Sequence, residues 1–138
     1  MTSLETLLVT HADTLRPLLG SLWPVRPQKV EYFGPLTKYT VGPMPDGRWA
    51  MFHHIREADT GPPHCHPCQM DILLLKGSYA ERIYRNGGAE DVLRVAGDFH
   101  TIEPERIHQL FALPEGEAWS LCFAGPVVRQ WRHYPELV

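Results

Sequence analysis

The sequence has little of what would place a protein in a membrane, on nucleic acid or in a disulfide-stabilised scaffold. It contains three cysteines, Cys65, Cys68 and Cys122, and an odd set is a poor disulfide framework that suits a reducing compartment. The longest apolar runs are short, such as Ile72 to Leu75, so none can span a bilayer. Lysines and arginines are scattered within a net charge of −3, so no basic stripe is available to bind nucleic acid. The N-terminus lacks the basic-then-apolar pattern of a signal peptide, so we expect a cytoplasmic protein.

The chain of 138 residues has the size and composition of one globular domain, with 43% hydrophobic and 21% charged residues. We expect a single domain over residues 1–138. Residues 1–22 are predicted to form an N-terminal α-helix, because leucines recur there at three- and four-residue steps. Thr2 and Glu5 have the spacing of a capping box, and Gly20 stands where a helix should end. Prolines are frequent from Pro24 onward, so regular helix is not expected there.

Residues 28–134 are predicted to form a β-barrel of about ten short strands separated by turn signals. Gly77-Ser78, the stretch 86–88 and Gly97-Asp98 are the expected hairpin connections. The predicted strands are 29–33, 38–41, 48–57, 70–76, 79–85, 91–95, 98–102, 108–113, 118–124 and 127–134.

Eight histidines are many for this length, and three of them have the spacing of metal ligands. His64 and His66 follow a proline-rich stretch and are two residues apart. In extended chain, side chains at i and i+2 point to the same face, so both rings can reach one ion. His108 follows the turn-like stretch 103–107 and begins another predicted strand. Imidazole nitrogen binds Fe(II), Zn, Ni and Cu, so these three residues predict a metal site.

These segments resemble the two motifs of the cupin superfamily over roughly residues 48–134. The first motif is matched by His64-Cys65-His66 and Gly77, and the second, more loosely, by Gly97, Pro104 and His108. The stretches 64–67, 77–79, 120–126 and 129–131 are also similar to those of a group of small cupin-like proteins. The resemblance implies an all-β double-stranded β-helix, the cupin or jelly-roll barrel, preceded by an N-terminal α-helix. It implies a divalent transition metal as cofactor, with Fe(II) first and Zn, Ni or Mn as alternatives.

The chain departs from the cupin pattern at the fourth ligand, because Met70 stands where cupins usually have a glutamate. Asp71 follows directly, but strand alternation puts it on the opposite face unless a bulge re-aims it. Cys68 shares the alternation of the histidines and is a third possible additional ligand. Without any of these, three neutral histidines leave open coordination positions, as in the thiol dioxygenase branch of cupins.

Other residues are expected around the ligands or in a substrate pocket: His53, Tyr79, Tyr84, Trp119 and Phe123. His53 shares strand alternation with Met51 and Ile55 and should face the interior, where a hydrogen-bonded core histidine is the alternative. Trp119 and Phe123 alternate with small residues, so their bulky face is predicted to point inward. Cys65 and Cys68 could form a redox pair or half of a zinc site, but the neighbouring prolines argue against the helix start that a redox pair needs.

The leading functional hypothesis is a metal-dependent dioxygenase that acts on a small organic substrate. The alternatives are a non-catalytic module that binds or senses a small ligand, and a zinc-dependent isomerase or hydrolase. We expect a small-molecule partner, no nucleic acid and no membrane. Cupins are often dimers, so a homodimer is also expected.

Overall fold

The computed structural model of the chain describes residues 1–137. It begins with two short helices, α1 (Leu4–Thr10) and α2 (Ala12–Leu19), and a 3₁₀ turn, η1 (Gly20–Leu22). The single helix predicted over residues 1–22 is therefore divided at His11. Pro17 weakens the second part further, because it has no N–H to complete a helical hydrogen bond.

The ends of this helical region only partly follow the expected capping pattern. The N-cap is Ser3, whose hydroxyl accepts a hydrogen bond from the Thr6 amide at 3.2 Å, so the predicted capping box of Thr2 and Glu5 is wrong. The Thr2 amide donates instead to the carboxylate of Glu117. Gly20 does end α2, with a φ of 55° that favours glycine.

Eight strands follow within the described residues 1–137, and most lie where the sequence predicts them. The predicted segments 70–76 and 79–85 are halves of one long strand, and 127–134 is not a strand. A short 3₁₀ turn, η2 (Pro135–Leu137), follows the strands. The strands are β1 (Lys29–Phe33), β2 (Leu36–Pro43), β3 (Trp49–Ile55), β4 (Met70–Arg85), β5 (Gly88–Val95), β6 (Phe99–Ile102), β7 (Ile107–Ala112) and β8 (Ala118–Ala124).

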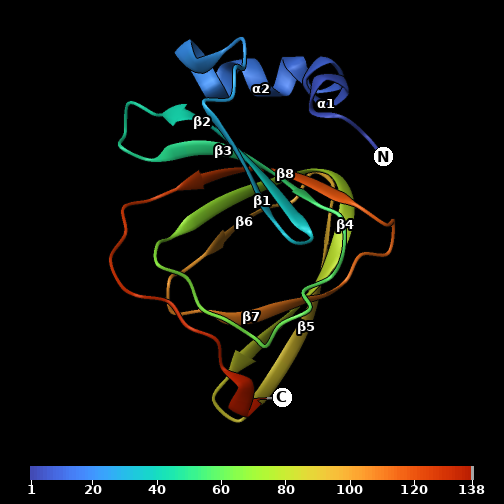
Figure 1. Cartoon of the computed structure of the whole chain (residues 1–138), viewed down its shortest axis with the longest axis vertical. Coiled ribbons are helices and arrows are strands. Elements are labelled where there is room, and N and C mark those ends of the chain that lie inside the picture. Colours follow the sequence, from blue (N-terminus) through green and yellow to red (C-terminus); the bar gives the residue numbers. More distant parts are fainter. Residues whose placement is uncertain (138) are drawn as a thin grey trace.

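The strands pair antiparallel and wrap around a central space, with both helices lying across one side (Figure 1). Strand β4 is the longest of these strands, and its two parts pair with different strands of the barrel. Its first part pairs with β6 and β8, and its second part pairs with β5 and β7. From β8 the sheet continues through β3 and β2 to β1 at its edge. Among residues 1–137, neither helix has the length and apolar character needed to cross a bilayer.

Gly77 lies inside β4 beside a bulge, and not in the hairpin turn predicted at Gly77-Ser78. The register of β4 against β8 shifts between Leu74 and Lys76, and Gly77 has a φ of 79°. A Cβ atom at Gly77 would lie 2.0 Å from the carbonyl oxygen of Glu117, so only glycine fits. The extra residue reverses the alternation of the strand. Even-numbered residues such as Ile72 face the interior before it, and odd-numbered residues such as Tyr79 face it afterwards.

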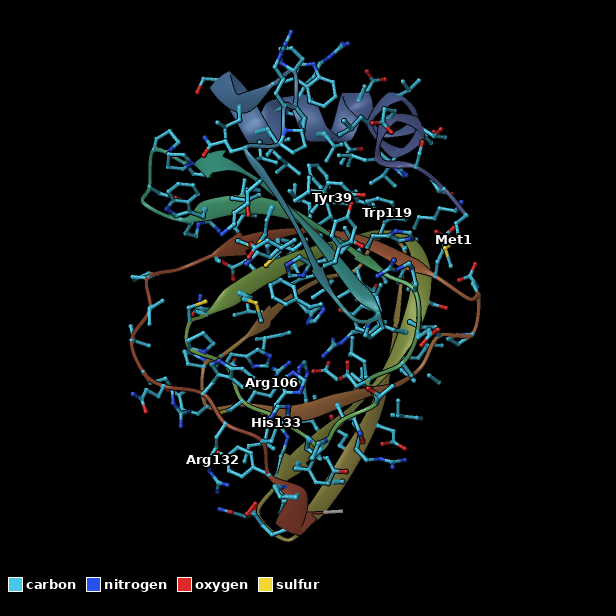
Figure 2. The ribbon with its side chains drawn as sticks, in the orientation of Figure 1. Met1, Tyr39, Arg106, Trp119, Arg132 and His133 are labelled. Carbon is cyan, nitrogen blue, oxygen red and sulfur yellow. The ribbon has the colours of Figure 1, made fainter. Side chains whose placement is uncertain are left out.

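The main apolar core lies between the helices and the outer face of the barrel. Trp119 and Phe52, both fully buried, contact the leucines of the helices there. Figure 2 shows Trp119 and Tyr39 in this layer, and their rings stack with centroids 5.8 Å apart. The chain's own helices thus cover the apolar outer face of the barrel. The buried members of this cluster are Leu4, Leu7, Leu15, Leu19, Val41, Ala50, Phe52, Leu75, Trp119, Leu121 and Phe123.

Candidate metal centre

The interior of the barrel contains a cavity of about 410 Å³. This volume lies within the range of about 300–1,000 Å³ typical of small-molecule pockets. The walls are mainly apolar, with residues such as Met51, Ile72 and Leu110, and the polar groups are few. His64, His66 and His108 all line this cavity.

Backbone hydrogen bonds hold the loop that carries His64 and His66 against β7. The amide of each of His64 and His108 donates to the carbonyl of the other, and both distances are 3.0 Å. The His66 amide donates to the carbonyl oxygen of Pro104 at 3.1 Å. The loop is therefore extended at His64 and His66, which puts both side chains on the cavity side.

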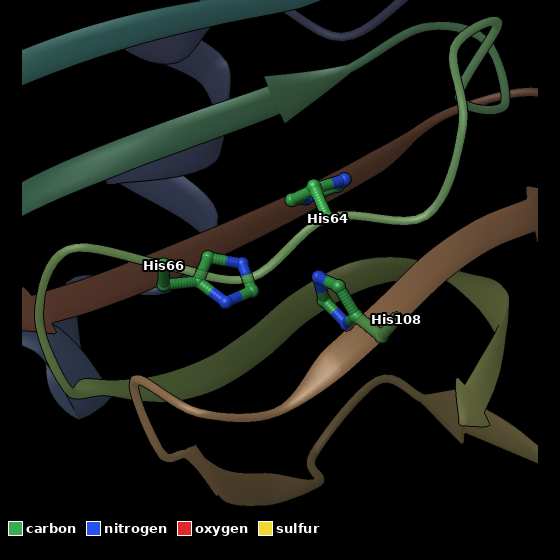
Figure 3. Close-up of side chains that lie close together, drawn as sticks. All are labelled: His64, His66 and His108. Atoms are coloured by element: carbon green, nitrogen blue, oxygen red, sulfur yellow. The ribbon is translucent and has the colours of Figure 1, made fainter. Parts of the chain in front are cut away.

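The three imidazole rings converge on one small space (Figure 3). One nitrogen of each ring lies within 4.8 Å of a nitrogen of each of the others. Ring centroids are 5.1 Å apart for His64 and His66, 4.9 Å for His64 and His108, and 4.6 Å for His66 and His108. Three imidazoles that converge in this way are suited to hold a transition-metal ion.

The surroundings of His64 and His66 favour the neutral form, which is the form that binds a metal. Burial, with the neighbouring His108 and His64, lowers the pKa of His66 to about 3. Burial also lowers the pKa of His64. The Nδ1 atom of His66 is buried without a hydrogen-bond partner among residues 1–137. A buried polar atom of this kind is uncommon in folded proteins.

Glu81 is a functional candidate that the sequence analysis misses. Its side chain is fully buried, and its carboxylate accepts a hydrogen bond from His108 Nδ1 at 2.5 Å. Arg94 donates to the same carboxylate at 3.1 and 3.2 Å, and Arg106 lies 3.6 Å from it. Burial alone would raise the pKa of Glu81, but the His108 hydrogen bond and the two arginines lower it to about 2. A carboxylate on one ring nitrogen leaves the other nitrogen free and sets the ring orientation.

The bulge at Gly77 explains why Glu81 is missed. If the alternation of His64 and His66 continued unbroken into β4, its even-numbered residues would face inward and its odd-numbered residues would face outward. The reversed alternation turns Glu81 inward, diagonally across from His108, whose direct partner on β4 is Ile83. Reading Gly77 as a bulge inside one strand would have found Glu81.

The three possible additional ligands lie outside the histidine cluster. Among residues 1–137, no Asp, Glu or Cys joins the cluster. Asp71 faces the other side of β4, where its carboxylate accepts hydrogen bonds from Arg48 at 2.9 Å and Thr101 at 2.8 Å. The bulge that would re-aim it occurs later in the strand. Cys68 and Met70 line the cavity and pack against Ile72 and Ile102.

The other predicted pocket residues divide into two groups. His53 and Tyr79 line the cavity, and the Tyr79 hydroxyl lies 2.7 Å from His100 Nε2. The inward prediction for Trp119 and Phe123 is wrong, because small residues of β8 face the cavity while these two pack under the helices. Tyr84 lies near the β4–β5 turn and lines a separate surface hollow.

The C-terminal segment after β8 closes one side of the histidine loop. The Cys65 amide donates to the Arg132 carbonyl at 3.2 Å, and the Tyr134 amide donates to the Pro63 carbonyl at 2.7 Å. Cys65 Sγ accepts hydrogen bonds from the Arg132 amide and the Tyr134 hydroxyl. Cys65 therefore anchors this segment. Trp131 lines the cavity, and Figure 2 shows His133 and Arg132 beside the barrel wall.

In sequence, no family model and no curated protein matches the chain. Solved structures do match, including hydroxypropylphosphonic acid epoxidase from S. wedmorenis in complex with fosfomycin (TM-score 0.58, 10% identity, 72% of this chain and 57% of that one). A structure of FeII HppE matches with a TM-score of 0.56 and 10% identity, over 70% of this chain and 55% of that one. The oxalate decarboxylase formate complex of Lactobacillus farciminis matches with a TM-score of 0.58 and 14% identity, over 78% and 34%.

The chain thus spans from about a third to just over half of these solved chains. At such low identity the likeness shows the fold alone. The fold is the all-β jelly-roll barrel of cupins with an N-terminal helical region, as the sequence predicts.

Proposed function

We propose that this protein binds one divalent transition metal through His64, His66 and His108 and acts as a non-haem Fe(II) dioxygenase on a small organic substrate. The observation that carries the proposal is the convergence of three imidazoles at one point in the wall of a cavity of about 410 Å³. A metal that is to bind substrate needs positions that protein ligands leave free, and three ligands leave such positions.

The residues present fit a transition metal. The donors are nitrogen atoms, His64 and His66 are neutral at pH 7, and Glu81 orients His108 by accepting its Nδ1 proton. A cluster without a carboxylate among residues 1–137 is also the ligand set that the likeness to thiol dioxygenases implies. The structural neighbour FeII HppE holds ferrous iron. Bound Fe(II) would supply the one-electron chemistry that O₂ requires.

The remaining cavity residues would bind the substrate and limit access of water. Most of the wall is apolar, so a small organic molecule would displace water from it. Tyr79 and His100 form a buried hydrogen-bonded pair at the cavity wall. Burial raises the pKa of Tyr79, so its hydroxyl keeps its proton. In the tautomer in which His100 Nε2 donates to this hydroxyl, that proton is free to donate a hydrogen bond to substrate.

Metal analysis of protein purified without added metal tests the site. We expect about one transition-metal ion per chain, and its loss in His64→Ala and His108→Ala. His133→Ala is the matched control, because its ring lies 6.1 Å from that of His64 but outside the cluster. Equal metal content in all four proteins would contradict the site.

Oxygen uptake by the anaerobically Fe(II)-loaded protein tests the reaction, with thiols, diketones and small acids as substrates. Uptake above that of free iron, lost in His108→Ala, supports the dioxygenase. Bound zinc without uptake would support an isomerase or hydrolase in which the metal activates water. A folded protein without metal would support a module that only binds a ligand.

A further inference from the structure

A row of polar side chains crosses the part of the cavity wall formed by β2, β3 and β8. Lys38 on β2 is the register partner of His53 on β3, and His53 is the partner of Ser120 on β8. All three line the same cavity as the histidine cluster. The row is set in an apolar wall, and the proposed metal site makes no use of it.

Lys38 is the only lysine or arginine among the described residues that line the cavity. Its ammonium lies 3.6 Å from Glu31 and 5.8 Å from the centre of the Phe33 ring at the cavity rim. An ammonium has three donors, so a contact with Glu31 leaves others for a ligand. The side chain is 29% exposed, so an anion bound there would be partly shielded from water, which strengthens the attraction.

His53 stands beside Lys38 with a free hydrogen-bonding position. Its Nε2 atom is buried and has no hydrogen-bond partner among residues 1–137. Burial, together with the charge of Lys38, lowers the pKa of His53 to about 4, so the ring is neutral at pH 7. A neutral imidazole can donate from Nε2 to an oxygen atom. An oxygen-bearing ligand would therefore satisfy an atom that the protein leaves unpaired.

The charges in the cavity are separated. Among the described lining residues, the one carboxylate is Asp59, which accepts a hydrogen bond from the Leu110 amide at 2.8 Å. Asp59 is thus held against β7, the strand that carries His108, whereas Lys38 and His53 are on β2 and β3. Apolar side chains occupy the wall around both: Met51, Ile55, Ile72, Ile102 and Leu110. An anion is favoured at one wall, and an apolar body fits the rest.

We infer that the cavity binds a small monocarboxylate with an apolar body, whose carboxylate contacts Lys38 and His53. This inference deepens the proposed function. It rests on that proposal only for the orientation of the ligand, whose other end would point toward the three histidines. A charge-assisted hydrogen bond from the ammonium and a second one from the imidazole would hold the carboxylate. The neutral amide of the same acid has the same shape and lacks the charge.

Calorimetric titration with butyrate, hexanoate, octanoate and phenylacetate, each beside its amide, tests the inference. We expect at least one acid to bind about tenfold or more tightly than its amide. Lys38→Met should remove this preference for the acid and leave the affinity for the amide unchanged. His53→Phe should reduce the preference for the acid. Lys29→Met is the matched control, because Lys29 also pairs with Glu31, at 3.4 Å, but does not line the cavity.

Each titration is run on metal-free and on zinc-loaded protein, so that failure of the inference is separate from failure of the metal site. A preference for the acid in both forms that depends on Lys38 supports the inference, even if no metal binds. A preference that needs the metal and survives Lys38→Met overturns it and places the carboxylate on the metal. Equal binding of acids and amides, or no binding of any of them, also overturns it while the metal site stands on its own analysis.

Discussion

The two faces of strands β3 and β8 differ sharply in chemistry although they share one backbone. The outer face presents Phe52, Trp119 and Leu121, all completely buried under the helices. The inner face presents Met51, His53 and Ser120 to the cavity. One face is close-packed, and the other leaves space for a ligand.

Because of this difference, we expect the stability of the fold and the binding of a ligand to depend on different faces of the same strands. Burial of large apolar side chains is the dominant favourable term in folding, and the largest buried apolar cluster lies on the outer face. The inner face leaves space beside polar side chains such as His53 and Ser120. Buried atoms without a hydrogen-bond partner among the described residues occur on both faces, at His53 Nε2 and at Trp119 Nε1, and they cost stability. Changes to the outer face should therefore affect unfolding, and changes to the inner face should affect binding.

Phe52→Ala should have the largest effect on stability. It removes a fully buried ring from the outer core, and we expect the free energy of unfolding to fall by about 3–5 kcal/mol. Urea denaturation followed by fluorescence measures it. Ser120→Ala, on the inner face nearby, is the control and should change the value by less than about 1.5 kcal/mol. Equal losses in both variants would remove the distinction between the two faces.

Glu81→Gln should weaken metal binding about 10- to 100-fold. An amide binds the Nδ1 proton of His108 less strongly than the carboxylate does, so the ring is held less firmly. Competition with a chelator measures the affinity on protein shown to be folded. Asp91→Asn, which removes the exposed partner of Arg82 on the adjacent strand, should leave the affinity unchanged. Unchanged affinity in Glu81→Gln would mean that Glu81 does not position His108.

Glu117→Gln should reduce the acid sensitivity of the outer face. Glu117 is nearly buried, and its carboxylate accepts hydrogen bonds from His54 Nε2 and the Thr2 amide. Burial would raise its pKa, but these contacts and Lys76 lower it from 4.5 to about 2. Because the folded pKa is below the unfolded one, the stabilisation is present above about pH 4.5 and is lost as the pH falls toward 2.

The size of this contribution is roughly 1–3 kcal/mol. Urea denaturation between pH 7 and pH 3 should show wild-type stability falling more steeply than that of Glu117→Gln. Glu115→Gln, in the exposed turn nearby, should follow the wild type. Parallel curves for wild type and Glu117→Gln would show that Glu117 adds no pH-dependent stability.

Much of this arrangement can be predicted from the sequence because it depends on local patterns. Strand alternation around Ala118–Ala124 predicts the strand itself, and the spacing of His64 and His66 predicts that both rings share a face. The same alternation does not say which face is inside, and for Trp119 and Phe123 the inward assignment is wrong. Bulky residues mark a buried face, but both faces of β8 are buried.

The sequence by itself determined the alternation of the strands, the helical segment before them and the candidate ligands, because these follow from neighbouring residues. Only the tertiary structure decided that Glu81 supports His108, that the helices cover the outer face of β8, and that Lys38 and His53 share one wall. These depend on the bulge at Gly77 and on strand pairing between residues far apart in the chain. Local propensity carries no information about such distant partners, so they appear only when the sheet closes.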